Sequence, residues 1–181
     1  GPPISLNRCV LAGGDDDAVD TYKSKVTIEN SIIRDWVNPN EDAKGVSVFV
    51  GEVILRRNLI VNCVVAVSSK SDGPLGVVRI DHCTITGIER GVTAGYKSNA
   101  TEGNLQFYIT NSIVRAEDAL ISEFGNDRFV SVIYCNLSES WPGSGNITGD
   151  PLFVNAAVGN YRLQGGSPWI GAGNPSAQVG R

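Results

Sequence analysis

A repeat of six short segments is the feature that most constrains the fold of this chain. Each segment begins and ends with Leu, Ile or Val and carries a small or amide residue at its fourth position. The segments are LNRCVL (6–11), IENSII (28–33), LRRNLI (55–60), IDHCTI (80–85), ITNSIV (109–114) and VIYCNL (132–137). Their fourth positions are separated by 22, 27, 25, 29 and 23 residues. Spacings in this range indicate a repeat architecture.

A second series of short segments lies between the first, and neither series has a helical pattern. Apolar and polar residues alternate in these segments, as they do along β-strands. The segments are AVDT (18–21), GVSV (45–48), VAVS (65–68), GVTA (91–94) and ALIS (119–122). A unit of this size without a helix cannot bury its apolar face alone, so it must stack on its neighbours.

Stacking such units as successive turns of a coil predicts an all-β fold, a single-stranded parallel β-helix (a solenoid) of about six coils. The inward Leu, Ile and Val of each coil would lie over those of the next. Leucine-rich repeats share the period, but their fixed leucine spacing and Asn or Cys consensus are absent here. A β-sandwich is the structural alternative, because its strands need not match at a fixed repeat position.

The repeats resemble those of the right-handed parallel β-helix superfamily with the pectate-lyase-like fold, over nearly the whole chain. The stretch NITGDPLFVNAAVGNYRLQGGSPWIGAG (146–173) is similar to the closing segment of many secreted bacterial β-helix proteins of uncharacterised function. The resemblance implies a right-handed coil in residues 1–145 and a C-terminal closing segment of the same domain in residues 146–181. We expect this segment to cover the last coil with its apolar residues, Leu152, Phe153, Leu163 and Trp169. The motif is specific for the architecture and not for an activity.

The four cysteines test the register of the repeats. Cys9, Cys83 and Cys135 share the fourth repeat position, whereas Cys63 lies on another strand. Coils stack about 4.8 Å apart, which would separate the Cα atoms of Cys9 and Cys83 by about 14 Å. A disulfide needs Cα atoms within about 7 Å of each other. We therefore predict four free, buried thiols that form a ladder with the other fourth-position residues, and no zinc site.

Charge and hydropathy exclude two classes of partner. The net charge is −4 and the basic residues form no run, so we expect no nucleic-acid binding. No stretch approaches the roughly 18 apolar residues of a membrane helix, so we expect no membrane insertion. The resemblance implies a secreted protein, extracellular or at the cell surface. Because nothing resembling a cap precedes Ile4, we expect a fragment of a larger protein whose other domains are its partners.

The acidic turn GGDDDAVD (13–20) holds four carboxylates, those of Asp15, Asp16, Asp17 and Asp20. Their mutual repulsion must be compensated. One interpretation is a calcium site, since Ca²⁺ takes carboxylate, carbonyl and water ligands, and calcium is the one cofactor we expect. A second is the acid and base of a hydrolase. The third is a hydrated turn in which some aspartates cap backbone amides. The aligned positions of later coils supply no further acid: Ser47, Ala66 or Val67, Thr93 and Ile121.

A polysaccharide lyase would need a base, commonly Lys, Arg, His or Tyr, beside a group that neutralises the substrate carboxylate. The candidates on outward positions are Arg56, Arg57, Arg79 and His82. His82 occupies the polar, turn-like third position of its repeat, where a structural hydrogen-bonding role is the alternative. Arg56 and Arg57 could bind a carboxylate bidentately, although exposed arginines are common.

Aromatic side chains beside polar loops can stack on sugar rings. Tyr22, Trp36 and Tyr96 are the candidates for substrate binding, although such residues also cover the edges of coils. Together with the resemblance, these residues predict a carbohydrate-interacting module that binds polysaccharide and is related to polysaccharide lyases or glycoside hydrolases. The alternative is a non-catalytic structural or display module of a large secreted bacterial protein. No complete catalytic set is visible, so the sequence leaves open whether the chain is an enzyme.

Overall fold

The computed structural model describes residues 2–38, 43–71, 74–94, 104–123 and 128–175. These residues form β-strands and one short 3₁₀ helix, η1 (Ala156–Val158). No helix in the described residues is long and apolar enough to cross a membrane. The strands are β1 (Ile4–Asn7), β2 (Val10–Gly14), β3 (Asp17–Glu29), β4 (Ile32–Trp36), β5 (Lys44–Arg56), β6 (Leu59–Cys63), β7 (Val65–Lys70), β8 (Gly76–Asp81), β9 (Thr84–Ala94), β10 (Leu105–Thr110), β11 (Ile113–Glu123), β12 (Arg128–Ile133), β13 (Asn136–Leu137), β14 (Ile147–Thr148), β15 (Phe153–Asn155) and β16 (Asn160–Leu163).

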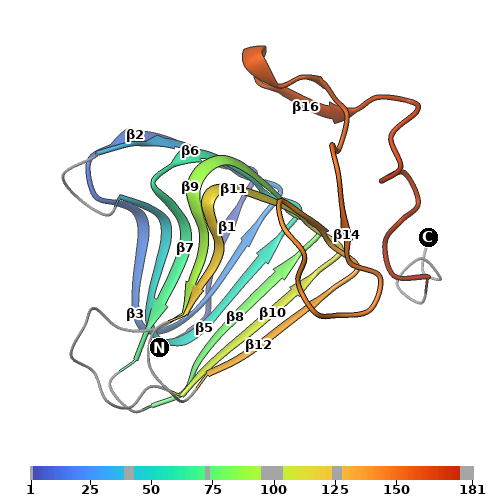
Figure 1. Ribbon diagram of the computed structural model, residues 1–181. Helices are drawn as coiled ribbons and strands as arrows, with labels where there is room; N and C mark the ends of the chain where they lie inside the picture. The colour runs from blue at the N-terminus through green and yellow to red at the C-terminus, as the bar shows by residue number, and fades with distance from the viewer. Residues whose placement is uncertain (1, 39–42, 72–73, 95–103, 124–127, 176–181) are drawn as a thin grey trace.

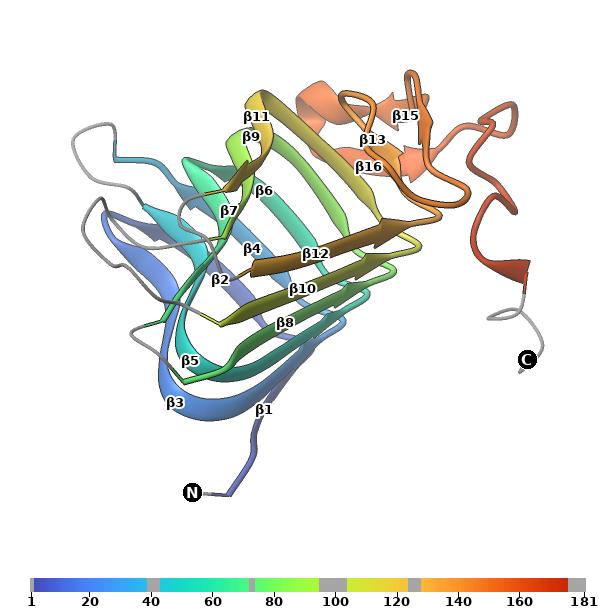
Figure 2. The same ribbon diagram turned by 60° about the horizontal axis from the view of Figure 1, so that its bottom comes forward.

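The strands wind into an all-β parallel β-solenoid of about four turns (Figure 1). We call the sheet of β1, β8, β10, β12 and the second halves of β3 and β5 the first face (Figure 2). The second face contains β2, β4, β6, β13 and the beginnings of β9 and β11. The third face contains β7, the first halves of β3 and β5, and the ends of β9 and β11. The right-handed winding of the coil and the number of six coils, both expected from the sequence, stay predictions.

The first residues of the six repeat segments stack in register on the first face. The aligned residues are Leu6, Ile28, Leu55, Ile80, Ile109 and Val132. All of this column is buried except Leu6 at its N-terminal end, which is half-buried. The pairing is parallel throughout the solenoid, which confirms the stacked-repeat interpretation and excludes the β-sandwich.

The register of the third face differs from the sequence alignment in two places. Asp20 pairs with Ser47, and the column continues through Ser68, Thr93 and Ser122. The sequence had placed Ala66 or Val67, and Ile121, in this column. In β7, Val65 pairs with Lys44 and so lies one residue ahead of the alignment. In β11, register shifts between Val114 and Ala119 place Ser122 opposite Thr93.

A tight corner joins the first face to the second in every repeat. All six residues at the third repeat position have a positive φ, between 50° and 57°: Arg8, Asn30, Arg57, His82, Asn111 and Tyr134. This left-handed conformation is uncommon for residues other than glycine, and it confirms that the third position is a turn. We call the outward side chains of these six residues the corner row.

A polar ladder lies directly behind the corner row, at the fourth repeat position. Side-chain oxygens of one coil accept the backbone N–H of the coil before it, at 2.9–3.1 Å. The pairs are Cys9 with Ser31, Ser31 with Asn58, Cys83 with Ser112, and Cys135 with Asn146. These bonds satisfy buried amides that would otherwise be costly to desolvate.

All four cysteines are free, as predicted from the register. Cys63, Cys83 and Cys135 are buried, and burial raises the pKa of these thiols to about 11, about 12 and about 12. Cys9 is only half-buried, so the expectation of four buried thiols is wrong in this one position. Cys9 lies in the first repeat, where a neighbouring coil covers it on one side only.

Residues that precede the C-terminal segment cover the last coil. Trp141 packs against the core there, and the backbone carbonyl of Ser144 accepts the N–H of Tyr134. The C-terminal segment itself continues from β14, which pairs with β13, to the β15–β16 hairpin, which lies beside the solenoid at the top of Figure 1. Trp169 is buried there, while the predicted covering residues Leu152, Phe153 and Leu163 are half-buried.

Candidate functional site

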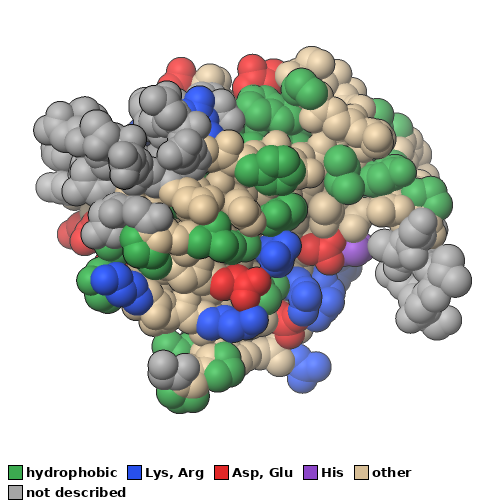
Figure 3. Space-filling view, turned by 90° about the horizontal axis from the view of Figure 1, so that it is seen from below, with side chains coloured by type: hydrophobic (Ala, Val, Ile, Leu, Met, Phe, Trp, Pro, Cys, Tyr) green, Lys and Arg blue, Asp and Glu red, His purple; other side chains and the backbone are tan. Residues whose placement is uncertain are grey.

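The structure brings the four predicted catalytic residues together on two neighbouring coils. Arg56 and Arg79 project outward from β5 and β8 on the first face, because Leu55 and Ile80 beside them point into the core. Arg57 and His82 follow directly in the corner row. Figure 3 shows this side of the molecule, where basic and acidic side chains alternate.

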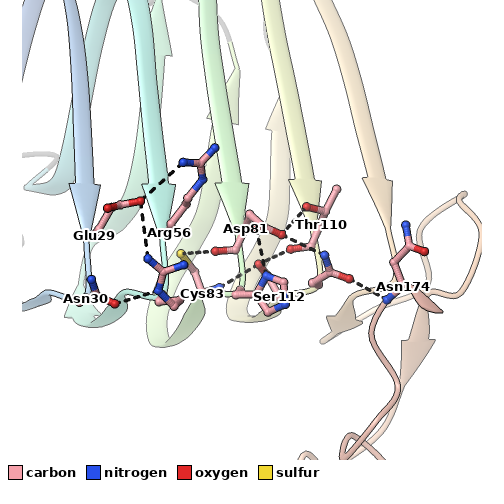
Figure 4. A network of polar contacts seen from close by, with 11 residues as sticks. Glu29, Asn30, Arg56, Asp81, Cys83, Thr110, Ser112 and Asn174 are labelled. Carbon is pink, nitrogen blue, oxygen red and sulfur yellow. Dashed lines mark hydrogen bonds and ion pairs between the residues drawn. The ribbon is translucent and has the colours of Figure 1, made fainter. Parts of the chain in front are cut away.

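Ion pairs occupy the three arginines. Glu52 lies between Lys25 and Arg79, with N–O distances of 2.7 and 3.1 Å. The hydrogen bond from Lys25, opposed by desolvation and reinforced by Arg79, holds the pKa of Glu52 below its ordinary value. Arg56 and Arg57 both pair with Glu29, at 3.5 and 3.6 Å (Figure 4). The first face is therefore a network of paired charges.

His82 and its neighbour Asp81 form the polar edge of this network. His82 Nδ1 lies 3.0 Å from Asp81 Oδ2. Thr110 and Asn111 donate hydrogen bonds to the other oxygen, at 2.8 and 2.9 Å (Figure 4). Burial raises the pKa of Asp81, but the hydrogen bonds from Asn111, His82 and Thr110 outweigh it, and the net pKa lies below the ordinary value.

An aromatic cluster that the sequence analysis missed lies on the same face. The rings of Tyr108 and Phe129 are 5.6 Å apart, and the Arg79 guanidinium lies 4.5 Å from the centre of the Tyr108 ring. Phe129 is 52% exposed. The signal was present in the strand LQFYIT, since an inward Phe107 requires Tyr108 to point outward by the alternation of side chains.

The three predicted substrate-binding aromatics do not form one site among the described residues. Tyr22 lies in a different region, where it stacks on Phe49 with ring centres 5.4 Å apart. Trp36 packs against the core, with its ring over Gly14. Tyr96 lies outside the described residues. Tyr22 alone of the three has an exposed ring in the described part of the chain.

The acidic turn contains one buried ion pair. Asp17 lies 3.1 Å from Lys44 Nζ on the next coil, and the two side chains are 10% and 3% exposed. Asp17 also accepts the backbone N–H of Lys44, at 3.2 Å. Asp15, Asp16 and Asp20 are exposed. No group of three or more His, Cys, Asp or Glu side chains in the described residues could hold a metal ion, and the calcium site stays a prediction.

Comparisons with protein-family models, with curated proteins and with solved structures find no match for this chain.

Proposed function

We propose that this chain is a carbohydrate-binding β-solenoid module whose first face binds a polysaccharide. The observation that carries the proposal is the outward cluster of Tyr108, Phe129 and Arg79 beside the network of paired charges. Aromatic rings present an apolar face on which the ring of a sugar can stack. The surrounding carboxylates, guanidinium groups and amides offer hydrogen bonds to its hydroxyl groups.

The form of the first face suits an extended polymer. Parallel strands about 4.8 Å apart repeat the outward positions from coil to coil, so equivalent side chains form rows across the sheet. One such row contains Thr27, Ile54, Arg79, Tyr108 and Ser131. A polysaccharide lying across the strands would contact several coils at once. Several weak contacts made together give a higher overall affinity than any one of them alone.

The ion pairs on the first face favour a module that binds polysaccharide without cleaving it. A lyase base must be free to reach a proton of the substrate, whereas an arginine in an ion pair is already bound to a carboxylate. Arg56, Arg57 and Arg79 are all paired in this way. A hydrolase would need two carboxylates free to act on one glycosidic bond, and Glu29 and Glu52 are both paired with basic groups.

The finer parts of the proposal rest on the sequence resemblance. The repeats and the segment 146–173 support a right-handed coil of about six turns that is similar to the pectate-lyase-like β-helices. The same resemblance supports a secreted location and a larger parent protein. A calcium ion held by Asp15, Asp16 and Asp20 would belong to the acidic turn rather than to the aromatic cluster.

Affinity electrophoresis in gels containing neutral or acidic polysaccharides tests the proposed function. We expect at least one polysaccharide to retard the chain, and Tyr108→Ala to weaken its binding about tenfold, since buried aromatic contacts dominate binding energy. Tyr22→Ala is the matched control, because Tyr22 also stacks on a phenylalanine and has a cation, Lys23 Nζ, 5.0 Å from its ring. We expect no change from this control, and equal binding with calcium or with a chelator.

Two outcomes would contradict the proposal. If no polysaccharide retards the native chain, the structural or display module becomes the better interpretation. If Tyr22→Ala weakens binding and Tyr108→Ala does not, the binding surface lies elsewhere. Thermal melts of both variants show whether a loss of binding reflects loss of the fold.

A further inference from the structure

A cleft separates the C-terminal segment from the corner row. One part has a volume of about 500 Å³ and lies between Asn111 and Tyr134 on the solenoid and Leu163 and Trp169 on the segment. A second part of about 380 Å³ lies between Arg57 on the solenoid and Tyr161 and Arg162 on the segment. His82 and Thr84 line both parts, so the two are neighbours along one cleft. These volumes fall within the range of ligand sites.

The side chains of the cleft combine positive charge with aromatic walls. Arg57, His82 and Arg162 line it, and neither part is lined by Asp or Glu. Arg57 shares Glu29 with Arg56, and Asp81 lies behind His82. Within the described residues, Arg162 forms no ion pair, and it is exposed. Arg162 is therefore the group best placed to bind an added anion.

Both walls of the cleft are held in place. On the solenoid side, Arg57 donates to the Asn30 side chain at 2.8 Å, and Asn111 donates to Asp81. On the other side, the segment is fixed near its start by hydrogen bonds from Arg115 to the carbonyl of Gly149, at 2.7 Å. It is fixed again near its end, where the N–H of Asn174 donates to Asn111 at 2.8 Å (Figure 4). A preformed cleft loses less entropy when a ligand binds.

We propose that this cleft binds a sugar unit that bears a carboxylate or a sulfate group, with Arg162 as the partner of the anion. Tyr161, Trp169 and Tyr134 supply the aromatic surface on which a sugar ring packs. The inference rests on the proposed function and deepens it. It adds a second subsite, and it names a negatively charged group on the sugar as the feature that this subsite recognises. The two sites adjoin, since Arg57 and His82 directly follow Arg56 and Asp81 of the first face.

The test compares the affinity of the native chain, Arg162→Gln and Arg8→Gln for four polymers. The polymers are a uronate polysaccharide, its carboxyl-reduced form, a sulfated polysaccharide and its desulfated form. Arg8 is the matched control, because it is an exposed arginine of the corner row that does not line the cleft. We expect Arg162→Gln to weaken binding of one anionic polymer about tenfold, as for loss of a charge-assisted hydrogen bond. Binding of the uncharged forms and the affinities of Arg8→Gln should not change.

The outcomes separate this inference from the proposed function. The anionic polymer that loses affinity identifies the group as carboxylate or sulfate. If Arg162→Gln binds every polymer as the native chain does while Tyr108→Ala binds less, the cleft inference is overturned and the proposed function stands. If the native chain binds none of the four polymers, the proposed function has failed and this inference fails with it. Because Arg162 is exposed, its substitution should leave the melting temperature unchanged, and the melt checks this.

Discussion

Two ion pairs in this solenoid each join a lysine to a carboxylate, in opposite surroundings. Asp17 and Lys44 join two coils with side chains that are 10% and 3% exposed. Lys25 and Glu52 also join two coils, at the shorter distance of 2.7 Å, but their side chains are 56% and 25% exposed. The comparison teaches which polar groups hold the stack together and which remain available to a ligand.

The difference arises from desolvation. A buried charge that loses its partner is still removed from water and has no compensating attraction. Removing one member of a buried pair therefore lowers the free energy of unfolding strongly. An exposed pair contributes little, because water replaces the partner. On the first face, Glu52 or Arg79 could therefore replace an ion-pair contact by a contact with a polysaccharide. Asp17 could not, because its ion pair with Lys44 is buried.

The largest effect should come from the buried pair. We expect Lys44→Met to lower the free energy of unfolding by about 3–5 kcal/mol, because it leaves the Asp17 carboxylate buried without this partner. Lys25→Met is the matched control on the exposed pair and should cost at most about 1 kcal/mol. Urea unfolding followed by circular dichroism measures both. Equal losses in the two variants would remove the distinction between the regions.

The polar ladder should show the next largest effect. Asn58 accepts the N–H of Ser31 at 2.9 Å and donates to the carbonyl of Ile28 at 2.8 Å, and it is buried. Asn58→Ala leaves both backbone groups without these bonds, so we expect a loss of about 2–3 kcal/mol in urea unfolding.

Asn58→Ser provides the control for this prediction. Ser31 and Ser112 occupy the same repeat position and accept the N–H of the preceding coil. A serine at 58 should therefore recover part of the loss, since it can accept from Ser31 but cannot reach Ile28. If Asn58→Ser is as unstable as Asn58→Ala, the size of the side chain and not the hydrogen bond decides stability at this position.

The repeat pattern made the first face predictable from the sequence. Each segment carries the same apolar ends and the same polar turn, so six weak local signals support one register. The turn at His82 and the free cysteines followed from that register. The third face was less predictable, because β7 has apolar residues at adjacent positions, Val65 to Val67, and these fit more than one register.

The candidate site was predicted in part. The outward positions of the arginines and His82 were predictable, since Arg56, Arg57 and His82 lie on repeat segments and Arg79 directly precedes one. Their ion-pair partners Glu29 and Glu52 were not predicted, because each lies on the preceding coil and meets its arginine only when the coils stack. The cleft was also missed, because the return of residues 159–173 beside the corner row depends on tertiary contacts such as that between Asn174 and Asn111.

The smallest expected effect lies at the edge of the first face and depends on pH. Hydrogen bonds from Asn111, His82 and Thr110 outweigh the burial of Asp81 and lower its pKa. A carboxyl group with a lowered pKa in the folded state contributes stability above its unfolded pKa of about 3.9 and loses it as the pH falls through the folded value. The wild-type chain should therefore lose this contribution below about pH 4.

Asp81→Asn isolates that contribution, since an amide oxygen can still accept hydrogen bonds but carries no charge. The Asp81 side chain is 35% exposed, so we expect the variant to be less stable at pH 7 by at most about 1 kcal/mol. Unfolding measured from pH 7 to pH 3 should show the two chains converging at the acidic end, because protonated Asp81 resembles the amide. A difference that stays constant across this range would mean that the amide disturbs packing rather than charge. Convergence would show that the edge of the first face, unlike the Asp17–Lys44 pair, contributes stability without being essential to the stack.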